Sequence, residues 1–164
     1  MNILVTGGAG YIGSHTARKL KELGHNVIIL DNLERGNARN CESMIFKEDI
    51  RDERALDKIF SQNQFDLVCH FAALISVPES MEKPEMYYDV NVEGTKTLLR
   101  AMKKHNCNRL IFSSTASLYE RFKEPVIEDN PIKPLNVYAK TKLEVEQYLK
   151  QQEWLDYVIF RYFN

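Results

Sequence analysis

Short apolar runs alternate along the chain with longer segments whose apolar residues fall on one helical face. Six short runs are nearly continuous and strand-forming, which is typical of parallel strands covered on both faces. These predicted strands are Ile3–Val5, Val27–Leu30, Met44–Phe46, Leu67–Cys69, Leu110–Phe112 and Tyr157–Phe160. The predicted helices are Ile12–Leu23, Glu53–Phe60, Met86–Lys104 and Tyr138–Gln151. This alternation predicts an α/β fold, a doubly wound parallel sheet of about six strands with helices on both faces.

Two polar stretches are predicted to be surface loops. Residues 33–40 contain a glycine, and residues 120–134 contain three prolines without a helical period. No internal repeat or linker divides the chain, so we expect one domain over residues 1–164. Only residues 161–164 follow the last predicted strand, whereas a domain normally ends in a docked element. We therefore expect the polypeptide to continue beyond this sequence.

Composition narrows the range of partners. The 164 residues are 44% hydrophobic and 27% charged, and 22 Lys and Arg against 23 Asp and Glu leave a formal net charge of −1. This balance leaves no extended basic surface for nucleic acid or anionic lipid. The three cysteines and four histidines have no metal-ligand spacing, and no apolar run is as long as a membrane span. We expect a cytoplasmic protein without a targeting segment, metal, nucleic-acid partner or membrane partner.

A glycine-rich motif lies between the first predicted strand and the first predicted helix. Its spaced glycines are Gly7, Gly10 and Gly13. They permit a tight turn, a close approach of the backbone to a pyrophosphate, and close packing of helix on strand, while the helix N-terminus attracts phosphate. The motif predicts dinucleotide binding; the alternative is a tight turn that holds no ligand.

Asp31 ends the second predicted strand. Its spacing from the glycines is that of a carboxylate which holds the ribose hydroxyls of a bound adenosine. A negative charge there repels a 2′-phosphate, so the expected cofactor is NAD rather than NADP. The alternative is a turn or capping role.

Tyr138 and Lys142 are four residues apart in a predicted helix, so they share one face and can reach the same ligand. The pKa of a phenol is ordinarily about 10, and an adjacent ammonium lowers it by stabilising the phenolate. Tyr138 is therefore a candidate proton acceptor. An ordinary surface pair is the alternative.

Hydroxyl side chains follow the fifth predicted strand, at the end of a parallel sheet where ligands bind. Thr115 is the best placed of them to donate to a substrate oxygen or to orient the tyrosine. For Ser113, Ser114 and Ser117, capping of the following turn is an equally good interpretation.

Together these residues resemble the extended short-chain dehydrogenase/reductases. Further shared segments are Asp31-Asn32, Asp49-Ile50, His70 to Ala73, and Asn91 to Thr95. Within that family the chain is most similar to the UDP-glucose 4-epimerases, through residues 4–15, 77–84 and 161–164. The resemblance covers the whole chain and implies a Rossmann-type NAD-binding domain.

The resemblance also implies a reaction, which is NAD-dependent epimerisation at carbon 4 of a UDP-hexose such as UDP-glucose or UDP-galactose. In the family, a tyrosine accepts the proton of the sugar 4-hydroxyl while hydride passes from carbon 4 to NAD+. Hydride then returns to the opposite face of the rotated 4-keto sugar. On this basis Tyr138 is the base, Lys142 binds the nicotinamide ribose and lowers the tyrosine pKa, and Thr115 polarises the 4-oxygen.

Cofactor-binding and substrate-binding residues follow from the same resemblance. The implied cofactor-binding residues are Gly7, Gly10, Tyr11, Ile12, Gly13, Asp31, Asn32, Asp49, Ile50, Phe71, Ala72, Ala73, Asn91, Ser113, Tyr138, Lys142 and Phe163. The implied substrate-binding residues are Thr115, Tyr138 and Asn164. The family's C-terminal substrate domain is absent from this sequence, and the family pairs as homodimers through helices that correspond to residues 86–104 and 138–151.

Some positions depart from the family or separate alternatives within it. Glu120 follows Tyr119 where the family usually has glycine, and Ile75 replaces a lysine found in some members. Nucleotide-sugar dehydratases carry an acidic pair after the threonine of the fifth strand, whereas this chain has Ala116 and Ser117, which favours epimerisation. The alternatives are a truncated NAD-binding module without sugar-nucleotide turnover and another nucleotide-sugar dehydratase or epimerase.

Overall fold

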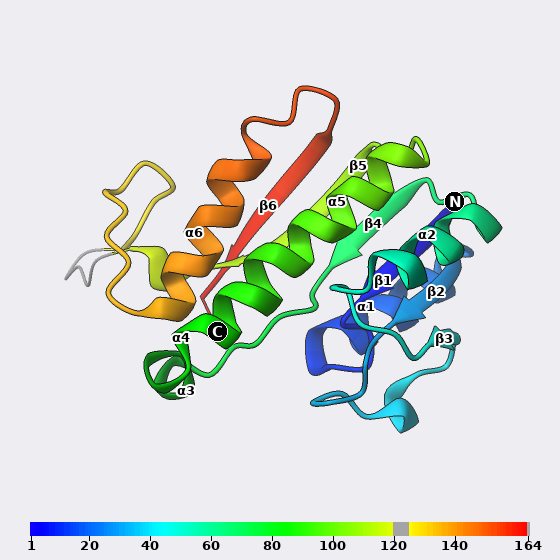
Figure 1. Ribbon diagram of the computed structural model, residues 1–164, viewed down its shortest axis with the longest axis horizontal. Helices are drawn as coiled ribbons and strands as arrows, with labels where there is room; N and C mark the ends of the chain where they lie inside the picture. Colours follow the sequence, from blue (N-terminus) through cyan, green and yellow to red (C-terminus); the bar gives the residue numbers. More distant parts are fainter. Residues whose placement is uncertain (120–124, 164) are drawn as a thin grey trace.

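The computed structural model describes residues 1–119 and 125–163 and, within them, one parallel sheet of six strands (Figure 1). The strands are β1 (Asn2–Thr6), β2 (Asn26–Leu30), β3 (Met44–Phe46), β4 (Leu67–His70), β5 (Arg109–Thr115) and β6 (Asp156–Tyr162). Each contains the apolar run that predicted it. Their spatial order is β3-β2-β1-β4-β5-β6, the doubly wound order in which the winding reverses between β1 and β4.

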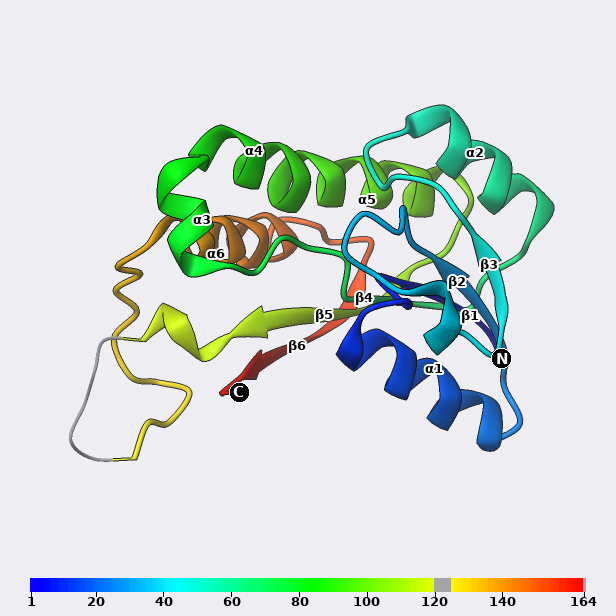
Figure 2. The ribbon, with the colours of Figure 1, turned by 90° about the horizontal axis from the view of Figure 1, so that it is seen from below.

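Helices lie on both faces of this sheet. They are α1 (Tyr11–Glu22), α2 (Glu53–Gln62), α3 (Val77–Glu82), α4 (Pro84–Tyr88), α5 (Gly94–Lys104) and α6 (Val137–Leu149). Figure 2 shows α2, α5 and α6 over one face and α1 over the other. The predicted doubly wound α/β sheet is confirmed.

The core explains why the strands are continuously apolar. Successive residues of β1 point to opposite faces, so that Leu4 packs with Leu110 and Met102 in the larger core, under the helices of the first face. Ile3 packs with Ala17 of α1 in the smaller core on the other face. Because both faces of the central strands are buried, neither face carries the polar residues of a half-exposed sheet.

The long helix predicted over residues 86–104 is wrong in detail. A π-helical segment, Asp89–Glu93, separates α4 from α5. Asn91 in this segment is 2% exposed, and its side-chain amide accepts a hydrogen bond from Leu74 N–H (2.8 Å) and donates one to Leu74 O (3.0 Å). The wider turn points Asn91 toward the loop after β4, an arrangement that the apolar periodicity does not encode.

No helix was predicted for residues 77–82, where α3 forms. Ser76 caps its N-terminus by accepting a hydrogen bond from Glu79 N–H (3.4 Å), and Pro78 occupies the first turn, where its missing N–H costs nothing. A single short turn of this kind has too few apolar positions to show a helical period.

His70, at the carboxyl end of β4, is a polar side chain inside the core. Its ring is 1% exposed and contacts Thr6 Oγ1 through Nδ1 (2.6 Å) and Thr95 Oγ1 through Nε2 (2.8 Å). Because the Thr95 hydroxyl donates to Asn91 O (2.6 Å), Nε2 is the protonated ring nitrogen. Burial, with a smaller effect of the Lys142 charge, lowers the pKa of His70 to about 3. A neutral ring therefore ties β1, β4 and α5 together beneath the strand ends.

Three further findings concern the described residues as a set. Among them, no helix is long and apolar enough to cross a membrane. No three His, Cys, Asp or Glu side chains of residues 1–119 and 125–163 converge as metal ligands would. Cys41, Cys69 and Cys107 are free thiols.

We expect acid to destabilise the fold through His70. Between pH 7 and pH 5 an unfolded histidine, with a pKa of about 6.5, gains a proton, while the buried ring, with a pKa of about 3, stays neutral. The unfolded state then binds more protons, so this group should lower the free energy of unfolding by about 2 kcal/mol over that interval. Urea unfolding at the two pH values measures the difference.

His70→Asn should lose most of this pH dependence, whereas the exposed His15→Asn should retain it. Equal pH dependence in the wild-type and His70→Asn chains would contradict a buried neutral ring.

Candidate active site

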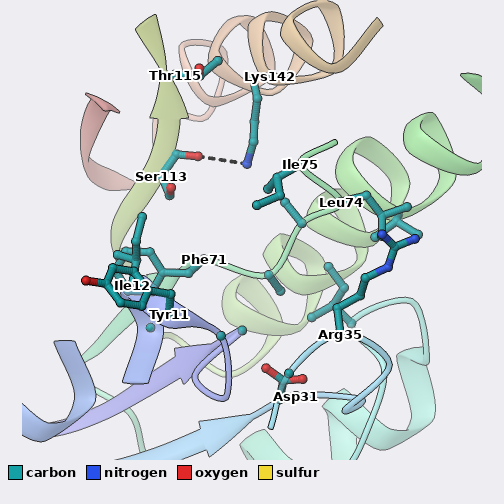
Figure 3. A pocket seen from close by; sticks show the side chains of 18 of the residues that line it. Tyr11, Ile12, Asp31, Arg35, Phe71, Leu74, Ile75, Ser113, Thr115 and Lys142 are labelled. Atoms are coloured by element: carbon teal, nitrogen blue, oxygen red, sulfur yellow. Dashed lines mark hydrogen bonds between the residues drawn. The ribbon is translucent and has the colours of Figure 1, made fainter. Parts of the chain in front are cut away.

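A cavity of about 970 Å³ lies along the carboxyl ends of the strands. In open parallel sheets this edge is where ligands bind, and the volume is at the upper end of the range for small-molecule sites. Figure 3 shows Asp31 and Arg35 in one part of the cavity and Ser113, Thr115 and Lys142 in another. One continuous space thus connects the glycine-rich loop with the hydroxyl-rich end of β5.

Most of the predicted site residues line this cavity. They are Gly7, Gly10, Tyr11, Ile12, Gly13, Asp31, Asn32, Asp49, Ile50, Phe71, Ala72, Ala73, Ser113, Thr115, Tyr138, Lys142 and Phe163. Asn91 is different, because its amide faces Leu74 and Thr141 Oγ1 (3.1 Å) behind the wall. It supports the loop after β4 instead of lining the cavity. Asn164, like Glu120, lies outside the described residues.

Two glycines allow the loop after β1 to pack against its surroundings. Gly7 has a φ of +69°, and a Cβ there would lie 2.5 Å from Ala72 N. A Cβ at Gly13 would lie 2.2 Å from Gly7 O. Residues 10–13 line the cavity. The N-cap residue of α1 is Gly10, so no side chain of the N-cap accepts a hydrogen bond from the first N–H groups of the helix. The first N–H groups of α1 are therefore available to an anion, as the motif predicted.

Asp31 is held in place by the same loop. Its Oδ2 accepts a hydrogen bond from Ala9 N–H (3.0 Å), and its Oδ1 accepts one from Leu33 N–H (2.9 Å). The carboxylate is 8% exposed and lines the cavity. Each carboxylate oxygen retains a second acceptor position for a ligand hydroxyl.

Asp49 adds a second charge at this end. Arg51 donates to both of its oxygens (2.9 and 2.8 Å), and Asn32 Nδ2 donates to Oδ2 (3.0 Å). The hydrogen bonds from the Arg51 guanidinium lower the pKa of Asp49 to about 2, so it is ionised at neutral pH. Its carboxylate holds Asn32 against the cavity wall.

Lys142 is almost completely buried at the other end of the cavity. Its side chain is 3% exposed, its Nζ donates to Ser113 O (2.9 Å), and the ammonium lies 4.9 Å from the centre of the Phe112 ring. Burial lowers the pKa of Lys142 to about 7.

Tyr138 lies one helical turn before Lys142 and is half-buried. Burial raises the pKa of this tyrosine, and a hydrogen bond with Thr115 acts in the opposite direction. Burial and Thr115 are the causes that act on the tyrosine pKa here, and the lowering by Lys142 that the family resemblance implies stays a prediction. In this structure Lys142 Nζ donates to Ser113 O.

The comparison with known families agrees with this geometry. Residues 3–164 match the model of the NAD dependent epimerase/dehydratase family. The chain belongs to this family.

Similar proteins in the epimerase/dehydratase family are UDP-glucose 4-epimerases. The enzyme of Halalkalibacterium halodurans is 47% identical and aligns with 100% of this chain and 51% of the relative. UDP-glucose 4-epimerase 1 of Oryza sativa subsp. japonica is 44% identical, and the alignment covers 99% of this chain and 51% of the relative. A solved structure of the Stenotrophomonas maltophila enzyme, with bound NAD and formylated UDP-arabinopyranose, is similar to this chain with a TM-score of 0.96 and 39% identity. The match covers 100% of this chain and 53% of that structure's chain. The chain thus spans about half the length of the curated relatives it matches.

The cavity also includes residues outside the predicted site. Arg35 lines it and reaches from the loop after β2 to Glu79 Oε1 on α3 (2.8 Å), and the hydroxyl of the buried Tyr87 donates to Glu79 Oε2 (3.0 Å). Arg35 and Glu79 are 44 residues apart, so their pairing has no local signal. Ile75, which stands where some family members have lysine, lines the cavity and is 69% exposed.

Proposed function

We propose that this chain is the NAD-binding part of a UDP-glucose 4-epimerase, an isomerase that inverts carbon 4 of a UDP-hexose such as UDP-glucose or UDP-galactose. One observation carries the proposal: the Tyr138–Lys142 pair lines the same cavity as the glycine-rich loop and Asp31. Relatives at 44% and 47% identity with that activity in their names support it. In this proposal the rest of the UDP-sugar site belongs to a further domain.

The residues present fit NAD. The open first turn of α1 would hold the diphosphate, and Asp31 would accept hydrogen bonds from the adenosine ribose. Lys142 would contact the nicotinamide ribose. When bound there, NAD supplies a hydride acceptor for carbon 4 of the sugar.

The chain's own groups would then move the proton. Tyr138 accepts the proton of the sugar 4-hydroxyl and later returns it. The reaction has no net redox change because the hydride that bound NAD would accept from carbon 4 would also be given back to carbon 4, on its opposite face. Thr115 holds the tyrosine oxygen and polarises the sugar 4-oxygen. Because the pKa of Lys142 is about 7, its charged form is available at neutral pH to stabilise the phenolate.

The residues after Thr115 support epimerisation over dehydration. Ala116 and Ser117 line the cavity at the positions where dehydratases carry an acidic pair. Neither side chain can act as the carboxyl acid or base that elimination of water from the sugar requires.

Tyr138→Phe should reduce conversion of UDP-galactose to UDP-glucose by about 100-fold or more, because it removes the general base. Conversion is measured with the purified 164-residue chain and added NAD+. The matched control is Tyr148→Phe on the same helix, outside the cavity lining, which should keep the wild-type rate.

Equal loss of conversion in both variants would contradict the assignment of Tyr138. A wild-type chain that binds NAD+ and converts no UDP-galactose would contradict turnover by this chain and favour the alternative of an NAD-binding module.

Because of Asp31, the chain should bind NAD+ with about tenfold or more higher affinity than NADP+, since the carboxylate charge repels the 2′-phosphate. Asp31→Asn should reduce this ratio of affinities. Glu48→Gln changes another acid of the cavity lining and should leave the ratio unchanged. Titration calorimetry with the two cofactors measures the ratio. Equal ratios in wild-type and Asp31→Asn chains would contradict this role.

Two chains should pair through α5 and α6, as the family resemblance implies. These helices lie side by side (Figure 1), and Lys96 of α5 reaches Glu144 of α6 (3.5 Å). Sedimentation equilibrium should give twice the chain mass of 19.1 kDa. Arg100→Glu on the exposed side of α5 should shift the equilibrium toward monomer, unlike Lys58→Glu on α2. A monomer at all concentrations would contradict the pairing.

A further inference from the structure

A third residue continues the Tyr138–Lys142 face of α6. Glu146 follows Lys142 at the same four-residue interval, so the three side chains form one stripe along the helix. The stripe packs on the end of β5, and its members contact, in order, Thr115, the carbonyl of Ser113 and the hydroxyl of Ser114.

Glu146 is 1% exposed, and all the described partners of its side chain belong to the sheet. Its Oε1 accepts a hydrogen bond from Ser114 Oγ (2.5 Å). Arg161 of β6 donates from Nε to Oε1 (3.0 Å) and from Nη2 to Oε2 (2.6 Å). Ser114 and Arg161 are opposite each other in the β5–β6 ladder. One buried carboxylate thus joins α6 to two neighbouring strands.

This arrangement restricts the movement of the helix. If α6 slid along β5 or rotated on it, Glu146 would lose either the Ser114 hydroxyl or the two-point contact with Arg161. The guanidinium is held in turn, because its Nη1 donates to Tyr119 Oη (2.6 Å). Buried ion pairs are often no more stabilising than apolar side chains of the same volume. The distinctive property of this pair is therefore its fixed geometry.

We propose that Glu146 is a positioning residue that fixes Tyr138 and Lys142 against the end of β5. Glu146 is absent from the described lining of the cavity and acts through the two residues before it on the stripe. The inference rests on the proposed function, in which these two residues carry the chemistry.

Lys142 reports on this positioning. Its amine is buried between α6 and β5, and loosening that contact admits water, which raises the pKa of a buried amine toward its ordinary value. Tyr138 and Glu146 are the ionisable neighbours on its own helix. From the sheet, His70 of β4 is close enough to be affected by the Lys142 charge, and it is neutral at pH 7 because its pKa is about 3.

Ser114→Ala tests the proposal without changing any charge. Glu146→Gln would leave the partly buried Arg161 without its counter-charge and is prone to unfold. In the 164-residue chain, lysine labelled with ¹³C at Cε gives the pKa of Lys142 by NMR, and Lys142→Arg assigns the signal. We expect Ser114→Ala to raise this pKa by about one pH unit. Glu144→Gln, at a half-exposed acid on the same helix, should not move it.

If Glu146 contributes only to the stability of the fold, a different result is expected. Ser114→Ala would then lower the melting temperature and leave the Lys142 pKa at its wild-type value, and this outcome overturns the proposal. The Lys142 measurement needs no turnover, so it is independent of the UDP-galactose assay. Full conversion by Tyr138→Phe would overturn the proposed function and not the positioning of Lys142.

Discussion

The close approach of two backbone segments, at Gly7 and Ala72, is the constraint on which the rest of the site depends. A Cβ on Gly7 would lie 2.5 Å from Ala72 N, so the loops after β1 and β4 meet with no side chain between them. Gly13 then packs on Gly7 O from the helix side. Because β1 and β4 are neighbours at the centre of the sheet, this contact sets the floor of the cavity and leaves the first turn of α1 open to it.

The sequence was sufficient for those parts of the fold that depend on burial or on local spacing. The central strands β1, β2 and β4 were predictable because both of their faces are covered, so they carry nearly uninterrupted apolar residues. The edge strands β3 and β6 carry apolar runs as well, although several of their side chains are exposed. The glycine-rich loop and the Tyr138–Lys142 pair were predictable because their geometry is contained in a few consecutive residues. Asp31 was predictable because it directly follows a recognisable strand at a defined distance from the glycines.

The remainder depends on partners that are distant along the chain. The π-helical segment forms where Asn91 bonds to Leu74, 17 residues earlier. Ser114 and Glu146 are separated by 32 residues. Periodicity reports that such residues are buried or exposed but does not identify what they contact. Asn91 was expected to bind the cofactor on the family resemblance, which does not identify the contacts of its side chain in this chain. That side chain is bonded to Leu74 and Thr141 behind the cavity wall.

Burial also changes the chemistry that spacing alone suggested. Four residues of helix place an ammonium beside a phenol, and in water that ammonium would be fully charged. In this chain the amine lies in the core, where burial lowers the pKa of Lys142 to about 7 and raises the pKa of Tyr138. Both shifts oppose formation of the phenolate. In the proposed function, where Tyr138 is the base, additional positive charge or hydrogen-bond donors near the tyrosine oxygen would favour the phenolate. Proton transfer would then depend on what occupies the cavity.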